Sequence, residues 1–245
     1  MTGKVNLSAR MKALADLVTI GNSACDVGCD HGYVSIYLVQ ERQAPKVLAM
    51  DVNKGPLERA ADNVRQMGLS DYITLRLSDG LSEYRQGEAE SLVIAGMGGK
   101  LMKRILEREP EKTGNFRELI LQPQSELAMF REFLRNLGYS IVEEDMILEE
   151  DKFYPIIKAV AGTYQGEDLR LEDRFGPVLL KKKHPVLKLF LQKEWESGLR
   201  IRADLLKAEK SPKVEMRLKE LSEEMDYLYQ AAKVCGCEKA FADPM

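Results

Sequence analysis

The hydrophobic positions divide the chain into two parts of different character. From residue 23 to residue 162, short apolar runs typical of buried strands alternate with stretches whose apolar residues recur at helical spacing. Beyond residue 162 only the helical spacing remains. We therefore expect an α/β domain over residues 1–164, with a doubly wound and mostly parallel sheet, and an α-helical domain over residues 165–245.

Seven strands are expected in the first domain, at residues 23–27, 46–51, 73–77, 91–95, 118–121, 139–142 and 154–160, with the last two antiparallel. Helices are predicted over residues 7–18, 33–39, 55–67, 99–108 and 127–137. Ser8 and Ser125 are suited to cap the first and last of these helices. Gly68 and Gly138 are suited to end the third and the fifth.

Two long helices joined into a hairpin are expected in the second domain. In the later helix the apolar positions alternate steps of four and three, as in a coiled-coil seam: Val214, Leu218, Leu221, Met225, Leu228, Ala232 and Cys235. The preceding helix has a rougher apolar stripe of Leu187, Leu191, Trp195, Leu199 and Leu206. Ser211 can cap the later helix and Pro212 can take its first position. The pattern leaves open whether the hairpin pairs internally or between two subunits.

Composition adds limits and one local contrast. With 245 residues and 44% hydrophobic content, the chain can bury a full core. Its net charge of −3 gives no general attraction to nucleic acid, but residues 174–213 hold eleven Lys or Arg against four Asp or Glu. This basic stretch is either a clamp on a phosphate backbone, which includes Lys181, Lys182 and Lys183, or the solvated face of a dimerisation device.

Compartment and metal content follow from what the sequence lacks. No apolar run approaches a membrane span and the first residues lack the apolar core of a signal peptide, so we expect a cytoplasmic protein without a membrane partner. Cys25 with Cys29 and Cys235 with Cys237 form C-x₃-C and C-x-C pairs, neither of which is the usual zinc spacing. We expect reduced thiols, no metal, and a monomer or weak dimer.

The loop between the first strand and its helix is the main candidate for a ligand site. Gly28 and Gly32 at its ends let the backbone turn tightly and come close to a ligand. A dinucleotide site has Gly-x-Gly-x-x-Gly, yet Asp30 stands at the middle glycine position and Asp26 lies just upstream. Two carboxylates would repel a pyrophosphate and attract a ligand that carries an ammonium and a sulfonium. S-adenosylmethionine is such a ligand.

Acidic and glycine residues also follow the next three strands. Asp51 comes about 20 residues after the loop, where a ribose-binding carboxylate is expected. Asp79 and Gly80 follow the third strand and could meet the adenine amine, and a glycine-rich stretch from Gly96 follows the fourth. Singly, each glycine could be a turn residue and each aspartate a helix cap. The ordered series is stronger evidence, since independent caps would rarely fall at these intervals.

Four short motifs and the hairpin occur together: Leu7-Ser-Ala-Arg10, Asp26-Val-Gly-Cys-Asp-His-Gly32, Ile94-Ala-Gly-Met-Gly-Gly99, Leu121-Gln-Pro-Gln124 and the helices after residue 165. With them the chain closely resembles, over essentially its whole length, the bacterial tRNA (adenine(22)-N1)-methyltransferases. The combination of Asp-His-Gly with Gly-Met-Gly-Gly is specific to that family. The resemblance implies a Rossmann-like class I methyltransferase domain with a coiled-coil tail, S-adenosylmethionine as cofactor, and methylation of N1 of one D-loop adenine in tRNA.

The resemblance also implies roles for residues at matching positions. The cofactor-binding set would be Asp26, Gly28, Asp30, His31, Gly32, Asp51, Asn53, Asp79, Gly80, Gly96 and Met97. The stretch from Gly96 to Gly98 would face the methyl group. It lacks the Asn/Asp-Pro-Pro-aromatic sequence of enzymes that methylate exocyclic amines, in agreement with a ring-nitrogen target.

Catalytic and substrate-binding candidates follow from the chemistry of the product, a positively charged base that a nearby carboxylate would stabilise. Asp30 is the first catalytic candidate and His31 the second, although a contact with the cofactor amine is an open alternative for Asp30. Candidates for holding the substrate are Arg10, Gly98, Gln122, Gln124 and Tyr154; Arg10 could instead be solvated and Tyr154 could belong to the core.

Two alternative functions remain open. One is a methyltransferase that acts on another RNA or on a small molecule, and the other is a non-catalytic cofactor-binding protein that recruits partners through its coiled coil.

Overall fold

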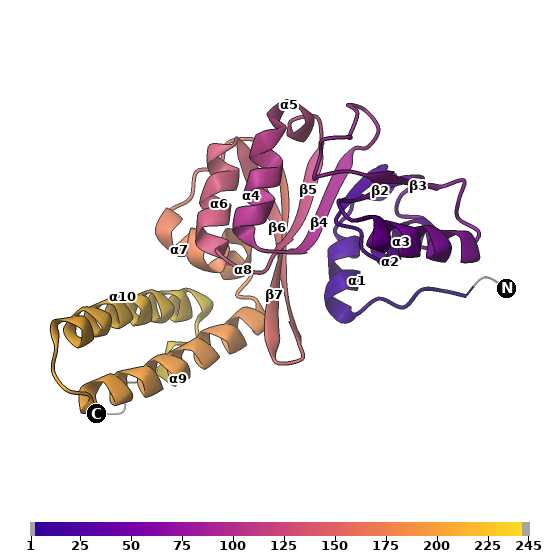
Figure 1. Cartoon of the computed structure of the whole chain (residues 1–245). Helices are drawn as coiled ribbons and strands as arrows, with labels where there is room; N and C mark the ends of the chain where they lie inside the picture. Colours follow the sequence, from indigo (N-terminus) through magenta and orange to yellow (C-terminus); the bar gives the residue numbers. More distant parts are fainter. Residues whose placement is uncertain (1–2, 242–245) are drawn as a thin grey trace. The chain divides into compact units, whose positions relative to one another are not determined.

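A seven-stranded sheet forms the centre of the first of two units into which the chain divides, Met1–Gln165 and Gly166–Met245 (Figure 1). The computed structural model describes residues 3–241. The strand order is β3-β2-β1-β4-β5-β7-β6. The strands are β1 Ala24–Val27, β2 Val47–Asp51, β3 Ile73–Leu77, β4 Ser91–Met97, β5 Glu118–Pro123, β6 Tyr139–Glu149 and β7 Lys152–Ala161. The first five are parallel, and β7 runs antiparallel to both β5 and β6, which confirms the predicted final pair.

Helices cover both faces of this sheet. Apolar residues of α1 (Ala9–Asp16), α2 (Tyr33–Gln40) and α3 (Lys54–Gln66) form one cluster with strand residues such as Ala24. Residues of α4 (Gly99–Arg108) and α6 (Leu127–Asn136), which pack side by side in Figure 1, form a second cluster with strand residues such as Cys25; the short α5 spans Pro110–Thr113. Neighbouring residues of β1 thus face opposite layers, as expected for a sheet buried on both sides.

The last two strands are longer than predicted. The charged run from Glu143 to Asp145 suggested that the strand ended at Val142, but β6 continues to Glu149 through a register shift between Ile141 and Glu143. Glu144 is buried in the strand because Arg131 Nε donates to its Oε1 at 2.9 Å. A buried ion pair therefore replaces the apolar contact that the pattern would require.

Two predicted caps are corrected by the structure. Ser8 occupies the N-cap position of α1, but its side chain makes no capping hydrogen bond. The N-cap of α6 is Glu126 rather than Ser125, and Glu126 has a φ of 50°. The Ser125 hydroxyl donates to the Glu126 carboxylate instead. Its hydroxyl is thus committed to a side chain and does not satisfy a backbone N–H of the helix.

The second unit is entirely helical over its described residues. Its elements are α7 Leu169–Phe175, α8 Pro177–Lys181, α9 Pro185–Lys207, α10 Pro212–Cys235 and a 3₁₀ turn at Glu238–Phe241. The Ser211 hydroxyl accepts from Val214 N, which confirms the predicted cap, and α9 packs against α10 of the same chain. Gly198 brings the two helices close, since a Cβ there would lie 3.2 Å from Met225 Cγ.

The apolar seam of this hairpin is buried unevenly. Leu221, Met225 and Leu228 are buried, whereas Val214 and Leu218 toward the turn are half-buried. Leu206 does not join the stripe of α9 as predicted: it is 65% exposed, because the final residues of α9 lie near the hairpin turn where little covers them. No helix among residues 3–241 combines the length and hydropathy needed to cross a membrane.

Candidate functional site

The loop that follows β1 adopts a conformation that few residues allow. Gly28, Asp30 and Gly32 have φ values of 78°, 46° and 72°, all in the left-handed region. Glycine enters this region freely, and aspartate enters it more readily than most residues. The amides of Gly28 and Cys29 both donate to Met50 O, at 2.8 and 3.0 Å. The loop is therefore fixed against the end of β2.

Asp26 is a buried carboxylate at the start of this loop, with only 5% of its surface exposed. Ser35 Oγ of α2 donates to its Oδ2 at 2.7 Å. Burial raises the pKa of Asp26 from 3.8 to about 6; the hydrogen bond from Ser35 opposes this rise and the negative charge of Asp51 adds to it. The buried negative charge of this carboxylate is therefore stabilised by any cation that reaches it.

Asp51 lies at the end of β2 and is held by two backbone amides. Its Oδ1 accepts from Asn53 N at 2.8 Å and its Oδ2 accepts from Asp30 N at 3.2 Å. Because each oxygen has a further lone pair, the carboxylate can still accept two hydroxyl protons side by side. This arrangement suits a ribose diol. Asn53, predicted at the same site, takes the N-cap position of α3.

A cavity of about 250 Å³ opens beside Asp26 and the loop after β1. The cavity is lined by Asn6, Leu7, Ser8, Met11, Asp26, Gly28, Cys29, Asp30, His31, Tyr33, Val34 and Ala95. The loop thus forms one wall, as predicted. The N-terminal segment forms another wall, in agreement with the expectation that the helix beginning at Leu7 lies against the cofactor side of the sheet.

Asp30 and His31 present their side chains at the mouth of this cavity. Asp30 is 64% exposed at its side chain, and its carboxylate lies 3.7 Å from Arg59 Nη2 and 3.7 Å from His31 Nε2. The His31 ring stacks against Tyr33 with 5.7 Å between centroids. The two residues therefore lie together where a second ligand could meet the first.

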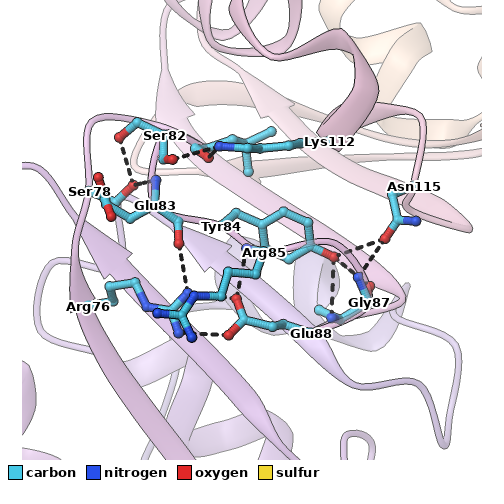
Figure 2. Close-up of polar contacts among 12 residues, drawn as sticks. Arg76, Ser78, Ser82, Glu83, Tyr84, Arg85, Gly87, Glu88, Lys112 and Asn115 are labelled. Carbon is cyan, nitrogen blue, oxygen red and sulfur yellow. Dashed lines mark hydrogen bonds and ion pairs between the residues drawn. The ribbon is translucent and has the colours of Figure 1, made fainter.

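Asp79 and Gly80 lie in a loop after β3 that is fixed by a dense set of polar contacts (Figure 2). Ser78 Oγ donates to Gly80 O and accepts from Glu83 N, while Lys112 Nζ donates to the carbonyls of Leu81 and Ser82. This network positions Asp79, whose exposed carboxylate pairs with Arg108 of α4.

The far end of the same loop is also tied down (Figure 2). Arg76 donates through both terminal nitrogens to Glu88, at 2.6 and 2.7 Å, and this pairing lowers the pKa of the Glu88 carboxyl. Asn115 Oδ1 accepts from Gly87 N at 2.8 Å. The loop is thus held at both ends, and Asp79 and Gly80 can present the same surface to each ligand.

The end of β4 approaches the β1 loop closely. Gly96 has a φ of 75° and sits at a register shift between β4 and β5, so this strand end bulges. A Cβ on Gly28 would lie only 2.3 Å from Met97 Cε. The Met97 side chain therefore packs directly on the loop after β1. Gly98 faces the Ser125 hydroxyl. The predicted methyl-facing stretch and the cofactor loop are therefore neighbours.

We expect Gly99→Ala to lower the free energy of unfolding by about 1–3 kcal/mol. A Cβ on Gly99 would lie 2.6 Å from Ser125 O, a backbone atom that cannot rotate away. Thermal unfolding of the variant measures this. Gly55→Ala is the matched control, because its new Cβ would meet only the Arg59 side chain at 3.6 Å. Equal stability of the two variants would contradict the tight packing at Gly99.

Four residues, one each from α1, β5, β6 and β7, meet on the side of the sheet beyond β4. Arg10 Nη1 donates to Gln122 Oε1 at 3.1 Å, and Arg10 Nε lies 3.2 Å from Glu149 Oε2. The Arg10 guanidinium also lies over the Tyr154 ring, 4.8 Å from its centroid. Glu149 was not among the predicted residues, while Gln124, which was, is exposed beside Gly96.

The remaining predicted residues lie in the second unit, where Lys181, Lys182 and Lys183 are exposed. The four cysteines are free of disulfides, and Cys29 on the cavity wall is buried. Burial, with the negative charges of nearby carboxylates led by Asp26, raises the pKa of the Cys29 thiol. Across residues 3–241, no three His, Cys, Asp or Glu side chains gather as metal ligands would.

Comparison with known proteins gives consistent matches. A family model described as a methyltransferase domain matches residues 7–157. The tRNA (adenine(22)-N(1))-methyltransferase of Bacillus subtilis (strain 168) is 32% identical over 229 residues, which cover 92% of this chain and 96% of that protein.

Solved structures are similar over the same extent. A Streptococcus pneumoniae protein in complex with S-adenosyl-L-methionine has a TM-score of 0.80 and 33% identity, and the match covers 94% of this chain and 100% of the other. M. capricolum TrmK in complex with S-adenosyl-homocysteine has a TM-score of 0.80 and 26% identity, over 94% and 99% of the two chains.

Proposed function

Because the chain belongs to the tRNA (adenine(22)-N1)-methyltransferase family, we propose that it transfers a methyl group from S-adenosylmethionine to N1 of adenine 22 in tRNA. The observation that supports this most strongly is the buried acidic edge of the cavity. Asp26 lines this edge at the end of β1. Asp51, at the end of the neighbouring β2, accepts from the backbone amide of Asp30 on the cavity wall, and both carboxylates are more than nine-tenths buried. Two buried carboxylates attract a cationic ligand and disfavour a pyrophosphate.

The cofactor roles are assigned by the chemistry of each group. Asp26 holds the ammonium group of the amino acid part, and Asp51 accepts the two ribose hydroxyls. Asp79 accepts from the adenine amine, while Gly28, Gly32 and Gly80 allow the backbone to approach closely. Met97 packs over the loop beside the sulfonium. Asn53, whose backbone amide donates to Asp51, and His31, which lines the cavity beside Asp30, complete the site.

Bound S-adenosylmethionine supplies an electrophilic methyl group on a positively charged sulfur. The chain contributes proximity and alignment of the adenine N1 lone pair with that methyl group, which can be worth about 7–11 kcal/mol. The base would acquire a positive charge as its bond to the methyl carbon forms and the carbon–sulfur bond breaks, with the bonding electrons left on the sulfur of the departing S-adenosylhomocysteine. Asp30 at the cavity mouth stabilises this charge, and His31, 3.7 Å from the Asp30 carboxylate, is a hydrogen-bonding group beside it.

The base must leave its stack before N1 can reach the cavity, since N1 lies on the Watson–Crick edge. We assign the holding of the extruded base to the rim formed by β4, β5 and β7. Tyr154 offers a ring for stacking and Gln122 and Gln124 offer amides. Gly98, which follows Met97 and faces the Ser125 hydroxyl, completes this rim. Arg10 lies over Tyr154 at 4.8 Å and is paired with Glu149, so we assign it to holding the shape of this substrate-side rim.

The helical unit is proposed to hold the body of the tRNA, because one flipped base gives too little affinity. Changing Lys181, Lys182 and Lys183 to glutamate should weaken tRNA binding about tenfold or more and reduce its dependence on salt. Binding titrations at several salt concentrations measure both effects. Cofactor affinity should stay unchanged, and an unchanged tRNA affinity would contradict the clamp.

One assay tests the reaction, the substrate and the acceptor atom together. The protein is incubated with isotopically labelled S-adenosylmethionine and unmodified tRNA, and the tRNA is digested to nucleosides. We expect the label in 1-methyladenosine. Label in another nucleoside would indicate a different target atom, and no transfer with intact cofactor binding would favour a binding protein.

The same assay decides between tRNA and other RNA when both are offered.

A tRNA substrate also implies a cytoplasmic enzyme, which we propose together with the function. The hairpin forms within one chain, so we propose a monomer or weak dimer, and light scattering across a concentration series measures this directly.

A further inference from the structure

Arg10, Gln122, Glu149 and Tyr154 form a built cluster on the acceptor side of the cavity. Besides the Arg10 side-chain contacts, the backbone amide of Arg10 donates to Glu149 Oε1 at 3.4 Å. Glu149 thus binds both the backbone and the guanidinium of Arg10. The side chains of Arg10 and Glu149 are only 24% and 23% exposed, so the pair is better shielded than a surface ion pair.

This cluster fixes the orientation of the Gln122 side-chain amide. An arginine has only hydrogen-bond donors, so the atom of Gln122 that lies 3.1 Å from Arg10 Nη1 must be the carbonyl oxygen. The –NH₂ group is therefore turned away from Arg10. Without Glu149 and Arg10 the amide could rotate by half a turn and offer an oxygen in the same place.

The –NH₂ group of Gln122 has no partner among the described residues. Gln122 is completely buried, and its Nε2 makes no hydrogen bond there. A buried donor without a partner destabilises the fold, so such groups are rare and each calls for an explanation. Since solvent does not reach the atom, a ligand must displace part of its cover to use it.

The sheet order indicates which ligand would use this donor. The cofactor site spans the ends of β1, β2 and β3, whereas Gln122 lies on β5, on the other side of β4. Gln122 is the register partner of Ala95, which lines the cavity. A base that approaches from the β5 side would therefore enter the cavity from the side away from the strands assigned to the cofactor, as an in-line transfer would require.

We propose that Glu149 and Arg10 are positioning residues that orient the Gln122 amide so that its –NH₂ group donates to a ring nitrogen of the target purine other than N1. The inference rests on the proposed function and adds the contact that aligns the base. A donor at N3 or N7 holds the ring while leaving the N1 lone pair free for the methyl group. A hydrogen bond to N1 itself would block the reaction.

Gln122→Glu tests the donor, because a carboxylate keeps the contact with Arg10 and the size of the side chain but removes the –NH₂ group. We expect kcat/KM for tRNA to fall about 10- to 100-fold, with the dissociation constant of S-adenosylmethionine unchanged within about twofold. Gln122→Met removes the donor without adding charge and replaces the first variant if that one does not fold. Gln66→Glu makes the same change at an exposed position of α3 and should leave kcat/KM unchanged.

Coupling between the residues tests the positioning role. Glu149→Gln releases Arg10 and should lower kcat/KM about fivefold in the wild-type background, and by nothing further in the Gln122→Glu background. If the losses in kcat/KM of the two single variants add in the double variant, the two residues act independently, and the positioning role of Glu149 and Arg10 is overturned. Wild-type kcat/KM in Gln122→Glu, or a loss confined to cofactor affinity, would overturn the proposed contact. Absence of 1-methyladenosine from the wild-type reaction would instead reject the proposed function.

Discussion

Asp26→Asn is expected to raise the free energy of unfolding at about pH 7.5 by about 3 kcal/mol while weakening cofactor binding. In the folded chain the pKa of Asp26 is raised to about 6, against 3.8 for an aspartate in its ordinary, solvated state. Each pKa unit is worth about 1.4 kcal/mol, so the charged carboxylate costs the fold about 3 kcal/mol above pH 6. Asparagine keeps the shape of the protonated acid and its oxygen still accepts from Ser35.

The sign of the effect fixes its pH dependence. Because the folded pKa is raised, this group favours folding below pH 4 and loses that contribution as the pH rises through about 6. The two proteins should therefore unfold alike at about pH 4 and differ most above pH 7, which denaturant titrations at both pH values measure. A variant that is less stable at neutral pH would mean that the carboxylate is structurally required.

Cofactor binding should favour the charged form of Asp26, whereas folding stability favours the uncharged form. The ammonium group of S-adenosylmethionine favours charged Asp26, so wild-type affinity should fall as the pH drops below about 6. Asp26→Asn should bind about 10- to 100-fold more weakly at neutral pH, with little change in affinity between pH 5 and pH 7. Calorimetry at both pH values tests this. An unaltered affinity in the variant would place the ammonium group elsewhere.

Asp30→Asn is expected to lower kcat for tRNA methylation about 100-fold, because it removes the carboxylate that we propose to stabilise the developing charge on the base. Asparagine is the right replacement, since it tolerates the positive φ of 46° at this position about as well as aspartate does. Single-turnover rates at saturating cofactor measure the chemical step. Asp62→Asn, an exposed change on α3, is the control.

The same variant separates the two roles considered for Asp30. A contact with the cofactor amine would weaken S-adenosylmethionine binding and leave kcat at saturation intact. The catalytic role predicts the reverse, a lower kcat with nearly unchanged cofactor affinity. The pairing of Asp30 with Arg59 and its 64% exposure place the carboxylate at the cavity mouth, which favours the catalytic role.

The parallel core was predictable because its strands carry a local signal. Apolar runs such as Val47 to Met50 are buried on both faces of the sheet and end at residues with a turn or cap preference. The parallel direction of β1 to β5 then follows from the alternation with helices, because parallel neighbours need a long crossover connection. The positions of Asp26, Asp51 and Asp79 at strand ends could be read for the same reason.

The acceptor side could not be predicted in the same way. Glu149 and Arg10 are 139 residues apart, and neither carries a local sign of the other. The turn between β6 and β7 uses Glu150 and Asp151 at φ values of 49° and 59°, a conformation that usually calls for Asn-Gly. Without that signal, the turn between β6 and β7 looked like part of a charged loop, and the strand that carries Glu149 appeared to end at Val142.

The buried thiol of Cys29 has a consequence for an enzyme that stores an alkylating agent. A sulfonium methyl reacts readily with thiolates, and Cys29 lines the cavity proposed to hold it. Burial and the surrounding carboxylates keep this sulfur protonated by raising its pKa, so it is a poor nucleophile. The same negative charges that attract the donor therefore protect the protein from methylating itself.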